Sequence, residues 1–212
     1  MAVENDRRGR GRPKTFDRAG VIDVALDSYW REGVYALSLN EICRRTGVSK
    51  PGLYREFGGE DGLMDAVLAQ YAEAVLGPLL ELLKSEVPFV QVLSTAVSFM
   101  TQPDRSVPAG CLLAKMRGSP SRLGPNTRAR VDSLGAIAVA AYADWVERAK
   151  TRGEIAADLP TDIAAAFLDT QFMTLLVQMA TKEDPALLRA QARLVFPGLT
   201  GGASTDAGFG EK

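Results

Sequence analysis

The chain has 212 residues with a formal net charge of −1, and 46% of them are hydrophobic. This length and apolar content suffice for a buried core, and abundant alanine and leucine with few β-branched runs predict an all-α fold. Histidine is absent and only two cysteines occur, which disfavours zinc sites, hydrolytic triads and a disulfide framework. We therefore expect no enzyme, no metal and no cofactor.

Positive charge is concentrated at the N-terminus. Residues 1–60 hold 11 basic and 9 acidic side chains, whereas residues 61–212 hold 14 and 17. The excess is sharpest in residues 1–15, predicted to be a flexible basic arm, whose cations are Arg7, Arg8, Arg10, Arg12 and Lys14. Such a segment suits the phosphates of DNA, although a purely solvated tail has the same composition.

Residues 16–60 predict three short helices. Each is preceded by a side chain that can cap its N-terminus, and glycines end the first two; these residues are Asp17 and Gly33, Ser38 and Gly47, and Ser49. Glu41 follows Ser38 at the spacing of a capping box, and Pro51 falls in the first turn of the third helix, where a missing N–H costs nothing. Two short helices joined by a tight turn are typical of a DNA-binding helix-turn-helix.

The pattern over residues 17–76 resembles the N-terminal domain of the TetR family of bacterial transcription regulators. The matching positions are Val21-Ile22, Ala25-Leu26, Gly33, Ser38-Leu39, Ile42, Gly47-Val48-Ser49, Leu53-Tyr54, Phe57 and Leu63. The resemblance implies that phosphates are held by Ser38, Ser49 and Tyr54. It implies a second set near base edges or the DNA backbone, namely Lys50, Pro51, Gly52 and Arg55, with the small Gly52 letting the helix approach the bases.

Two acidic residues depart from the family pattern. Glu60 stands where family members often place a lysine that grips a phosphate, and Glu56 where a histidine or other neutral residue is common. Because phosphate repels a carboxylate, we expect these contacts to be absent or arranged differently. DNA affinity is then expected to depend more on the arm. Its segment Arg10-Gly11-Arg12-Pro13 resembles the core of an AT-hook, which implies that Arg10 and Arg12 enter a narrow minor groove.

Residues 61–198 predict a larger helical domain for regulation and dimerisation. A connecting helix is expected over 61–76, ending near Gly77-Pro78, and further helices at about 88–101, 111–117, 127–152, 161–181 and 185–196, about nine in all. Residues 199–212 are expected to be a disordered tail. No export segment is visible, and the most apolar stretch, 163–180, is interrupted by Asp169, so we expect a buried helix, no membrane partner and a cytoplasmic protein.

The helix expected at 161–181 is apolar almost all round, so it needs burial on two sides. The domain core supplies one side and a second copy the other, which fits the family habit of pairing the last two helices in a four-helix bundle. The interface residues expected are Phe167, Leu175, Met179, Leu187 and Leu194. A symmetric homodimer places two recognition helices about 34 Å apart, which predicts double-stranded DNA with a palindromic operator as the partner.

An apolar pocket for an unidentified small-molecule effector is expected where large or flexible side chains gather. The candidates are Phe99, Met100, Leu113, Met116, Tyr142, Trp145, Phe172, Met173 and Leu176. Plain core packing is the alternative for each of them. Polar anchors are expected among Tyr142, Trp145, Gln171 and Arg117.

These features predict a transcription repressor that an apolar ligand releases from its operator. One alternative is a thiol-based redox or electrophile sensor that uses Cys111, because a helix N-terminus can lower the pKa of a thiol. Another is a helical enzyme using Asp169, Glu147 or Tyr142 as acid or base. A third is a helical dimer that coats DNA without sequence preference.

Overall fold

The structure is a computed structural model that describes residues 16–102 and 108–200. Arg10 and Arg12, and with them the predicted arm, lie outside the described residues. Every regular element in the described part is helical, which confirms the all-α prediction. The N-terminal elements are α1 (Arg18–Glu32), α2 (Leu39–Thr46) and α3 (Lys50–Phe57). They are followed by α4 (Glu60–Tyr71), η1 (Ala72–Leu76), α5 (Gly77–Lys84), α6 (Phe89–Met100), α7 (Leu112–Arg117), η2 (Pro120–Arg122), α8 (Pro125–Thr151), α9 (Thr161–Ala180), α10 (Pro185–Val195) and η3 (Phe196–Leu199).

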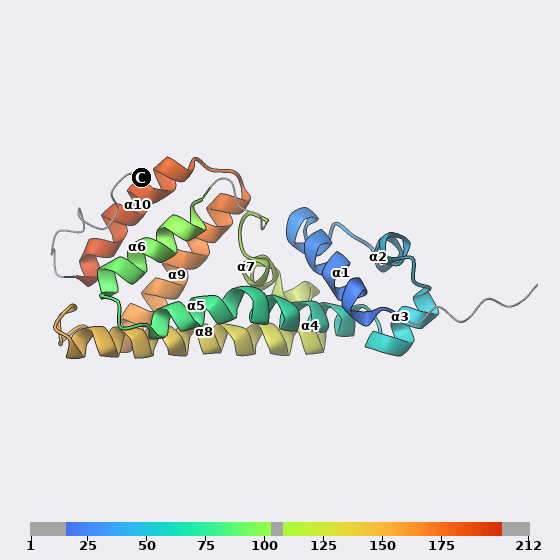
Figure 1. The fold of residues 1–212 in the computed structure, drawn as a ribbon, viewed down its shortest axis with the longest axis horizontal. Helices are drawn as coiled ribbons and strands as arrows, with labels where there is room; N and C mark the ends of the chain where they lie inside the picture. Colours follow the sequence, from blue (N-terminus) through green and yellow to red (C-terminus); the bar gives the residue numbers. More distant parts are fainter. Residues whose placement is uncertain (1–15, 103–107, 201–212) are drawn as a thin grey trace, which may run out of the picture.

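The molecule is elongated, with two parts built along one pair of long helices. Figure 1 shows α4, α5 and α8 side by side along the long axis, α1–α3 at one end, and α6, α9 and α10 stacked over the other end. A single apolar core runs through both parts, from Val21 and Leu53 near α1–α3 to Trp145 and Phe172 in the larger part. The two parts are therefore held to each other by continuous packing.

The connecting helix does not end at Gly77-Pro78, which corrects the sequence prediction. The helical run continues from Glu60 to Lys84 through a π-helical turn, η1. The Gly77 N–H donates to the Ala72 carbonyl, five residues back. This wider turn carries the chain past Pro78, which lacks an N–H, without ending the helix. With Glu60–Lys84 counted as one, the described residues contain nine α-helices, as expected.

Two helical stretches, Glu60–Lys84 and Thr161–Ala180, are long and apolar enough to cross a membrane by length and composition. Core helices of soluble proteins pass the same test. Helix α9 packs against α6, α7, α8 and α10, yet only 39% of its most apolar window is buried. Within the protomer, α9 is therefore buried on one of its sides only.

Several contacts join the smaller part to the larger one, among them one at the start of α4 and one at the end of α1. The Asp61 carboxylate, at the start of α4, accepts hydrogen bonds from the backbone N–H groups of Asn126 and Thr127 at 3.0 and 2.9 Å, and so caps the N-terminus of α8. At the end of α1, the Trp30 indole N–H donates to the Gly110 carbonyl at 3.2 Å. These contacts connect the position of α1–α3 to the positions of α4 and of the segment before α7.

Candidate nucleic-acid interface and ligand cavity

Helices α2 and α3 form a helix-turn-helix whose caps follow the sequence. The Ser38 hydroxyl accepts a hydrogen bond from the Glu41 N–H at 3.3 Å, and the Ser49 hydroxyl accepts one from the Gly52 N–H at 3.2 Å. Gly47 lies between the helices with φ of 69°, a left-handed conformation that favours glycine. The turn therefore fixes how α3 projects from the domain.

Helix α3 presents a polar face to solvent. Leu53 is fully buried and anchors the opposite face, whereas Lys50, Pro51 and Arg55 are exposed and the Tyr54 side chain is 49% exposed. The hydroxyl-bearing caps Ser38 and Ser49 are exposed as well. All of these predicted DNA-binding residues lie at the surface of the helix-turn-helix.

Gly52 is the exception among the predicted contacts. It is buried, and a Cβ built on it would lie 3.1 Å from the Ser49 hydroxyl oxygen and 3.7 Å from the Phe16 ring. A side chain here would crowd the Ser49 hydroxyl that caps the helix, whereas its contact with Phe16 would be an ordinary one. The expectation that Gly52 lets the helix approach the bases stays a prediction.

The cations of α2 and α3 fall into two groups. The Glu41 carboxylate, predicted to complete a capping box, instead binds the guanidinium groups of Arg44 and Arg45 at 2.7 and 2.8 Å. Hydrogen bonds from these two arginines lower the pKa of Glu41 to about 2. Among the described residues, Lys50 and Arg55 have no acidic partner. Their charges are free to meet an anion.

The two acidic departures differ in their surroundings. Glu56 forms an ion pair with Arg18 at 3.2 Å, and the Arg18 guanidinium also lies 5.2 Å from the centre of the Phe57 ring. The negative charge of Glu56 is thus offset within the domain. Glu60 is exposed in the first turn of α4, where a negative charge suits the helix dipole.

The family model for bacterial regulatory proteins of the tetR family matches residues 21–67, which span α1–α3 and the first part of α4. By this match, residues 21–67 form an N-terminal domain of the TetR family. The positions that carry the resemblance in the sequence fall in this segment or next to it, and they form the helix-turn-helix described above.

Curated TetR-type relatives match chiefly in the same region. The transcriptional repressor ComR of Escherichia coli is 42% identical over 67 residues, which are 32% of each chain. The repressor BdcR of the same organism is 30% identical over 117 residues, covering 53% of this chain and 58% of BdcR. The activator FasR of Mycolicibacterium smegmatis is 30% identical over 92 residues. The matched segments thus span about a third to somewhat over half of these relatives.

Solved TetR-family structures share the fold over most of the chain. A cysteine-substituted CifR in complex with 26-bp double-strand operator DNA covers 89% of this chain and all of its own, with a TM-score of 0.75 and 23% identity. Reduced Escherichia coli NemR covers 88% of this chain and 99% of its own, with a TM-score of 0.75 and 18% identity. At these identities the likeness establishes the fold, including the helical C-terminal part.

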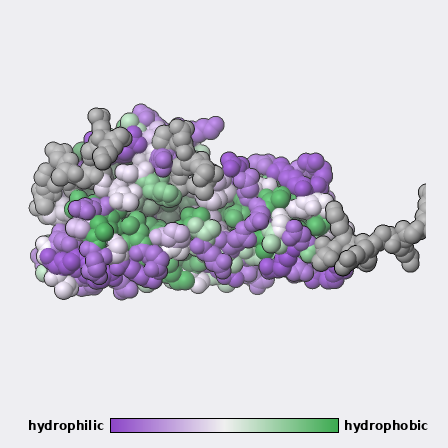
Figure 2. Space-filling view, viewed as in Figure 1, coloured by the Kyte–Doolittle hydropathy of each residue, from purple (hydrophilic) through white to green (hydrophobic). Residues whose placement is uncertain are grey.

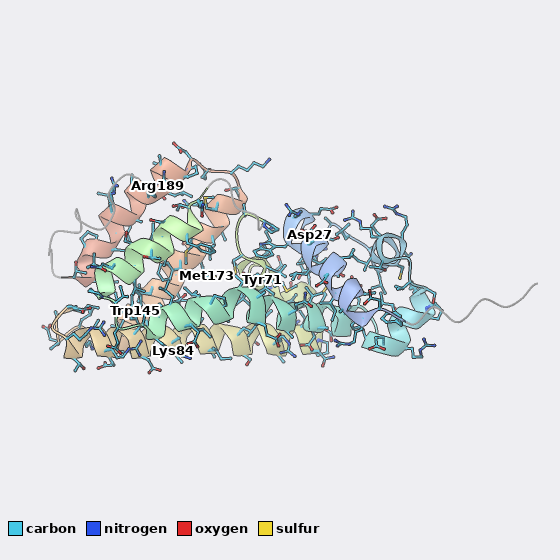
Figure 3. The ribbon with its side chains drawn as sticks, in the orientation of Figure 1. Asp27, Tyr71, Lys84, Trp145, Met173 and Arg189 are labelled. Carbon is cyan, nitrogen blue, oxygen red and sulfur yellow. The ribbon has the colours of Figure 1, made fainter. Side chains whose placement is uncertain are left out.

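A cavity of about 300 Å³ lies between the connecting helix and α6, α7, α8 and α9. Figure 2 shows apolar side chains gathered around a hollow over α5 and α6. Six predicted pocket residues line the cavity, namely Phe99, Met100, Leu113, Tyr142, Met173 and Leu176. Tyr71 and Met173, labelled in Figure 3, approach it from α4 and α9. Its volume is at the lower end of the range for small-molecule sites.

Three other predicted pocket residues belong to the core instead. Trp145 is fully buried and stacks on Phe89 with ring centroids 4.1 Å apart. Phe172 is fully buried between Tyr142 and Phe196, and Met116 is also fully buried. Of the four expected polar anchors, Tyr142 and Arg117 line the cavity, whereas Trp145 and Gln171 do not.

The polar end of the cavity includes a residue that the pocket prediction missed. The Asp169 carboxylate is buried and forms an ion pair with the Arg117 guanidinium, with 3.1 Å between Asp169 Oδ2 and Arg117 Nη1. The signal in the sequence is a single acidic residue inside a long apolar stretch. Burial, followed by the charge of Asp169, raises the pKa of Tyr142. The phenol therefore stays protonated at neutral pH.

Cys111 does not have the surroundings of a reactive thiol. Its Sγ accepts hydrogen bonds from the Tyr71 hydroxyl at 3.0 Å and from the Ala114 N–H at 3.4 Å. Burial raises the pKa of the Cys111 thiol, and the hydrogen bond from Tyr71 opposes this only in part. The helix-terminus argument for a lowered pKa is thus wrong here, because desolvation has the larger effect.

Helices α9 and α10 each carry large apolar side chains that the protomer leaves exposed. Ile163 is 61% exposed, Val177 48%, Leu187 49% and Leu194 84%, and Phe167 is half-buried beside them. Two residues predicted for a dimer interface, Leu175 and Met179, are instead each 5% exposed and face the protomer core. The helix has two apolar faces, and these two residues belong to the inner one.

Proposed function

We propose that the protein is a sequence-specific transcription regulator, most simply a repressor. The supporting observation is the outer face of α3, where Lys50 and Arg55 carry charges that no described acidic residue neutralises, next to Tyr54. Cations and exposed hydroxyls suit phosphates and base edges. In this proposal Ser38, Ser49, Lys50, Pro51, Tyr54 and Arg55 contact DNA, and Arg10 and Arg12 add minor-groove contacts.

The exposed apolar side chains of α9 and α10 are proposed to pack against the same side chains of a second copy of the chain. The large ones among them, Ile163, Val177, Leu187 and Leu194, are exposed in the protomer, and apolar side chains gathered at a surface often mark a protein–protein interface. A two-fold axis through this surface gives a homodimer with two α3 helices. Two such helices match a palindromic operator. A cytoplasmic location without a membrane partner completes the proposal.

The cavity is proposed to hold an effector whose binding weakens operator affinity. Cys111 and Tyr71 line the cavity, and the Tyr71 ring lies edge-on to the Trp30 ring of α1 with centroids 5.0 Å apart. The Trp30 indole in turn bonds Gly110, another lining residue. A ligand that moves this wall therefore moves α1, and it shifts the equilibrium by its differential affinity for the two arrangements.

Selection of bound sequences from random duplex DNA tests the proposed function. The purified chain is expected to enrich sequences with two-fold symmetry, and Lys50→Ala is expected to reduce the enrichment. Arg44→Ala serves as a matched control, because Arg44 lies in α2 and its charge is already paired with Glu41. Equal recovery of random sequences by the wild-type chain would reject sequence-specific binding in favour of nonspecific coating.

A further inference from the structure

The chemistry of the effector can be read from the polar end of the cavity. The lining is mainly apolar, formed by side chains such as Leu79, Leu82, Leu113 and Met173. At one end Tyr142, Arg117 and Asp169 come together with Cys111. Because most of the wall offers no hydrogen bonds, the few polar atoms decide which functional group a ligand can carry.

Tyr142 is a buried donor that lacks an acceptor. Its side chain is 1% exposed, and among the described residues its hydroxyl has no hydrogen-bond partner. Because Tyr142 lines the cavity, its hydroxyl is available to donate a hydrogen bond to an oxygen of a bound ligand. The protonated phenol can donate to a ligand acceptor, and Arg117, which lines the same cavity, can only donate, so the two side chains together favour a ligand oxygen that accepts.

Arg117 adds donors without adding net charge. Its Nη1 bonds both oxygens of Asp169, at 3.2 and 3.1 Å. In the described part of the chain its Nε and Nη2 have no acceptor. The Arg117–Asp169 pair is neutral overall, so a ligand carboxylate would meet Asp169 and a ligand ammonium would meet Arg117. Either charge would be buried without full compensation.

We propose that the cavity takes an uncharged, mainly apolar molecule through one carbonyl oxygen, which accepts a hydrogen bond from the Tyr142 hydroxyl. Arg117, which also lines the cavity, is a second donor available to the ligand. Neutral ketones, aldehydes, esters and quinones of a size that fits about 300 Å³ share this chemistry. The inference rests on the proposed role of the cavity as the effector site.

Four matched probes test the class: benzylacetone, n-butylbenzene, phenylbutyrate and phenylbutylamine. Calorimetry with the full chain and no DNA measures binding alone. Benzylacetone is expected to bind at least about tenfold more tightly than either charged probe. Undetectable benzylacetone binding, or tighter binding of a charged probe, would overturn the proposal.

The variant Tyr142→Phe tests whether the Tyr142 hydroxyl donates a hydrogen bond to the ligand carbonyl. The loss of one hydrogen bond is expected to weaken benzylacetone about fivefold to tenfold and to leave n-butylbenzene within about twofold. Tyr29→Phe is the control, because Tyr29 is also a buried phenol without a partner but does not line the cavity. An equal change for both probes in Tyr142→Phe would contradict the assigned bond.

An infrared measurement covers the case in which Tyr142→Phe does not fold. The carbonyl stretch of benzylacetone bound to the wild-type chain is expected at lower frequency than in hexane, as for a hydrogen-bonded ketone. An unshifted band would overturn the proposal. Operator binding is then measured with and without benzylacetone. If the probe binds with the expected Tyr142 dependence while operator affinity stays unchanged, the ligand class stands and the proposed regulation fails.

Discussion

The Asp61 carboxylate and the Thr127 side chain tie the first turn of α4 to the first turn of α8. The Thr127 hydroxyl donates to Asp61 Oδ1 at 2.6 Å, and the Thr127 backbone N–H donates to the same oxygen at 2.9 Å. Arg130 and Asp65, one turn further along, form an ion pair beside them. Helix α4 follows α3 after two residues, so this clamp fixes the base of the helix-turn-helix.

Replacing Asp61 is expected to loosen that clamp. Asp61→Ala removes the cap of α8 and should lower the free energy of unfolding by about 1–2 kcal/mol at pH 7. Arg31→Ala is a surface control, because its ion pair with Asp27 is exposed and contributes at most about 1 kcal/mol. Urea unfolding measures both, and equal stability of Asp61→Ala and wild type would contradict the clamp.

The same clamp predicts a dependence on pH. Burial raises the pKa of Asp61, but the hydrogen bonds from Thr127 and Asn126 outweigh it and lower the pKa overall. The stabilising contribution is therefore complete above the unfolded value of about 3.9 and is lost as the pH falls through the lower folded value. Unfolding of wild type and Asp61→Ala from pH 7 downward should show a constant difference that shrinks only below about pH 4.

If α9 and α10 form the dimer interface, a charged substitution there should weaken dimerisation. Leu194 is 84% exposed, so Leu194→Arg should leave the protomer folded while placing charges in the proposed interface. Sedimentation is expected to show dissociation at concentrations about tenfold or more above those for the wild type, with a parallel loss of operator affinity. Ile137→Arg on α8, where the native side chain is 44% exposed, is the control. Unchanged dimerisation of Leu194→Arg would place the interface elsewhere.

The thiols are expected to differ in reactivity. Cys43 is half-buried, whereas Cys111 is buried with a raised pKa. A thiol reagent at neutral pH should therefore label Cys43 first, and Cys111→Ser should remove only the slow phase. Labelling of Cys111 at the faster rate would revive the redox-sensing alternative.

Local signals in the sequence predicted the N-terminal domain well. Asp17, Ser38 and Ser49 cap their helices as expected, because a capping residue acts on backbone groups two or three positions away. Gly77-Pro78 misled the prediction, because a π-helical turn carries the helix past a proline that normally ends it.

In the larger part of the molecule, the sequence does not predict which residues line the cavity, because tertiary packing decides it. Trp145 and Met173 have the apolar character of cavity and core residues alike, and only the arrangement of α6, α8 and α9 separates them. Leu175 was placed on the wrong face of α9, because a helix that is apolar all round carries no periodic signal for its outer side. The nearness of Phe16 to Gly52 joins residues far apart in the sequence, and no local pattern shows it.

The affinity of Lys50→Ala for the selected operator tests one contact of α3. Loss of a cation that meets phosphate or guanine should weaken binding about tenfold or more. If the contact is to phosphate, the slope of log affinity against log salt should fall by about one. Arg44→Ala, whose charge is paired with Glu41, should change affinity by less. Equal effects of the two variants would show that the unpaired charge on α3 has no special role.

The central claim is that two copies of α3 read one duplex together, and a ratio of two dissociation constants tests it most directly. Fluorescence anisotropy at physiological salt compares the selected palindrome with the same duplex after one half-site is scrambled. The account predicts that scrambling weakens binding by a factor of about a thousand or more, towards nonspecific affinity. A ratio near one would contradict it.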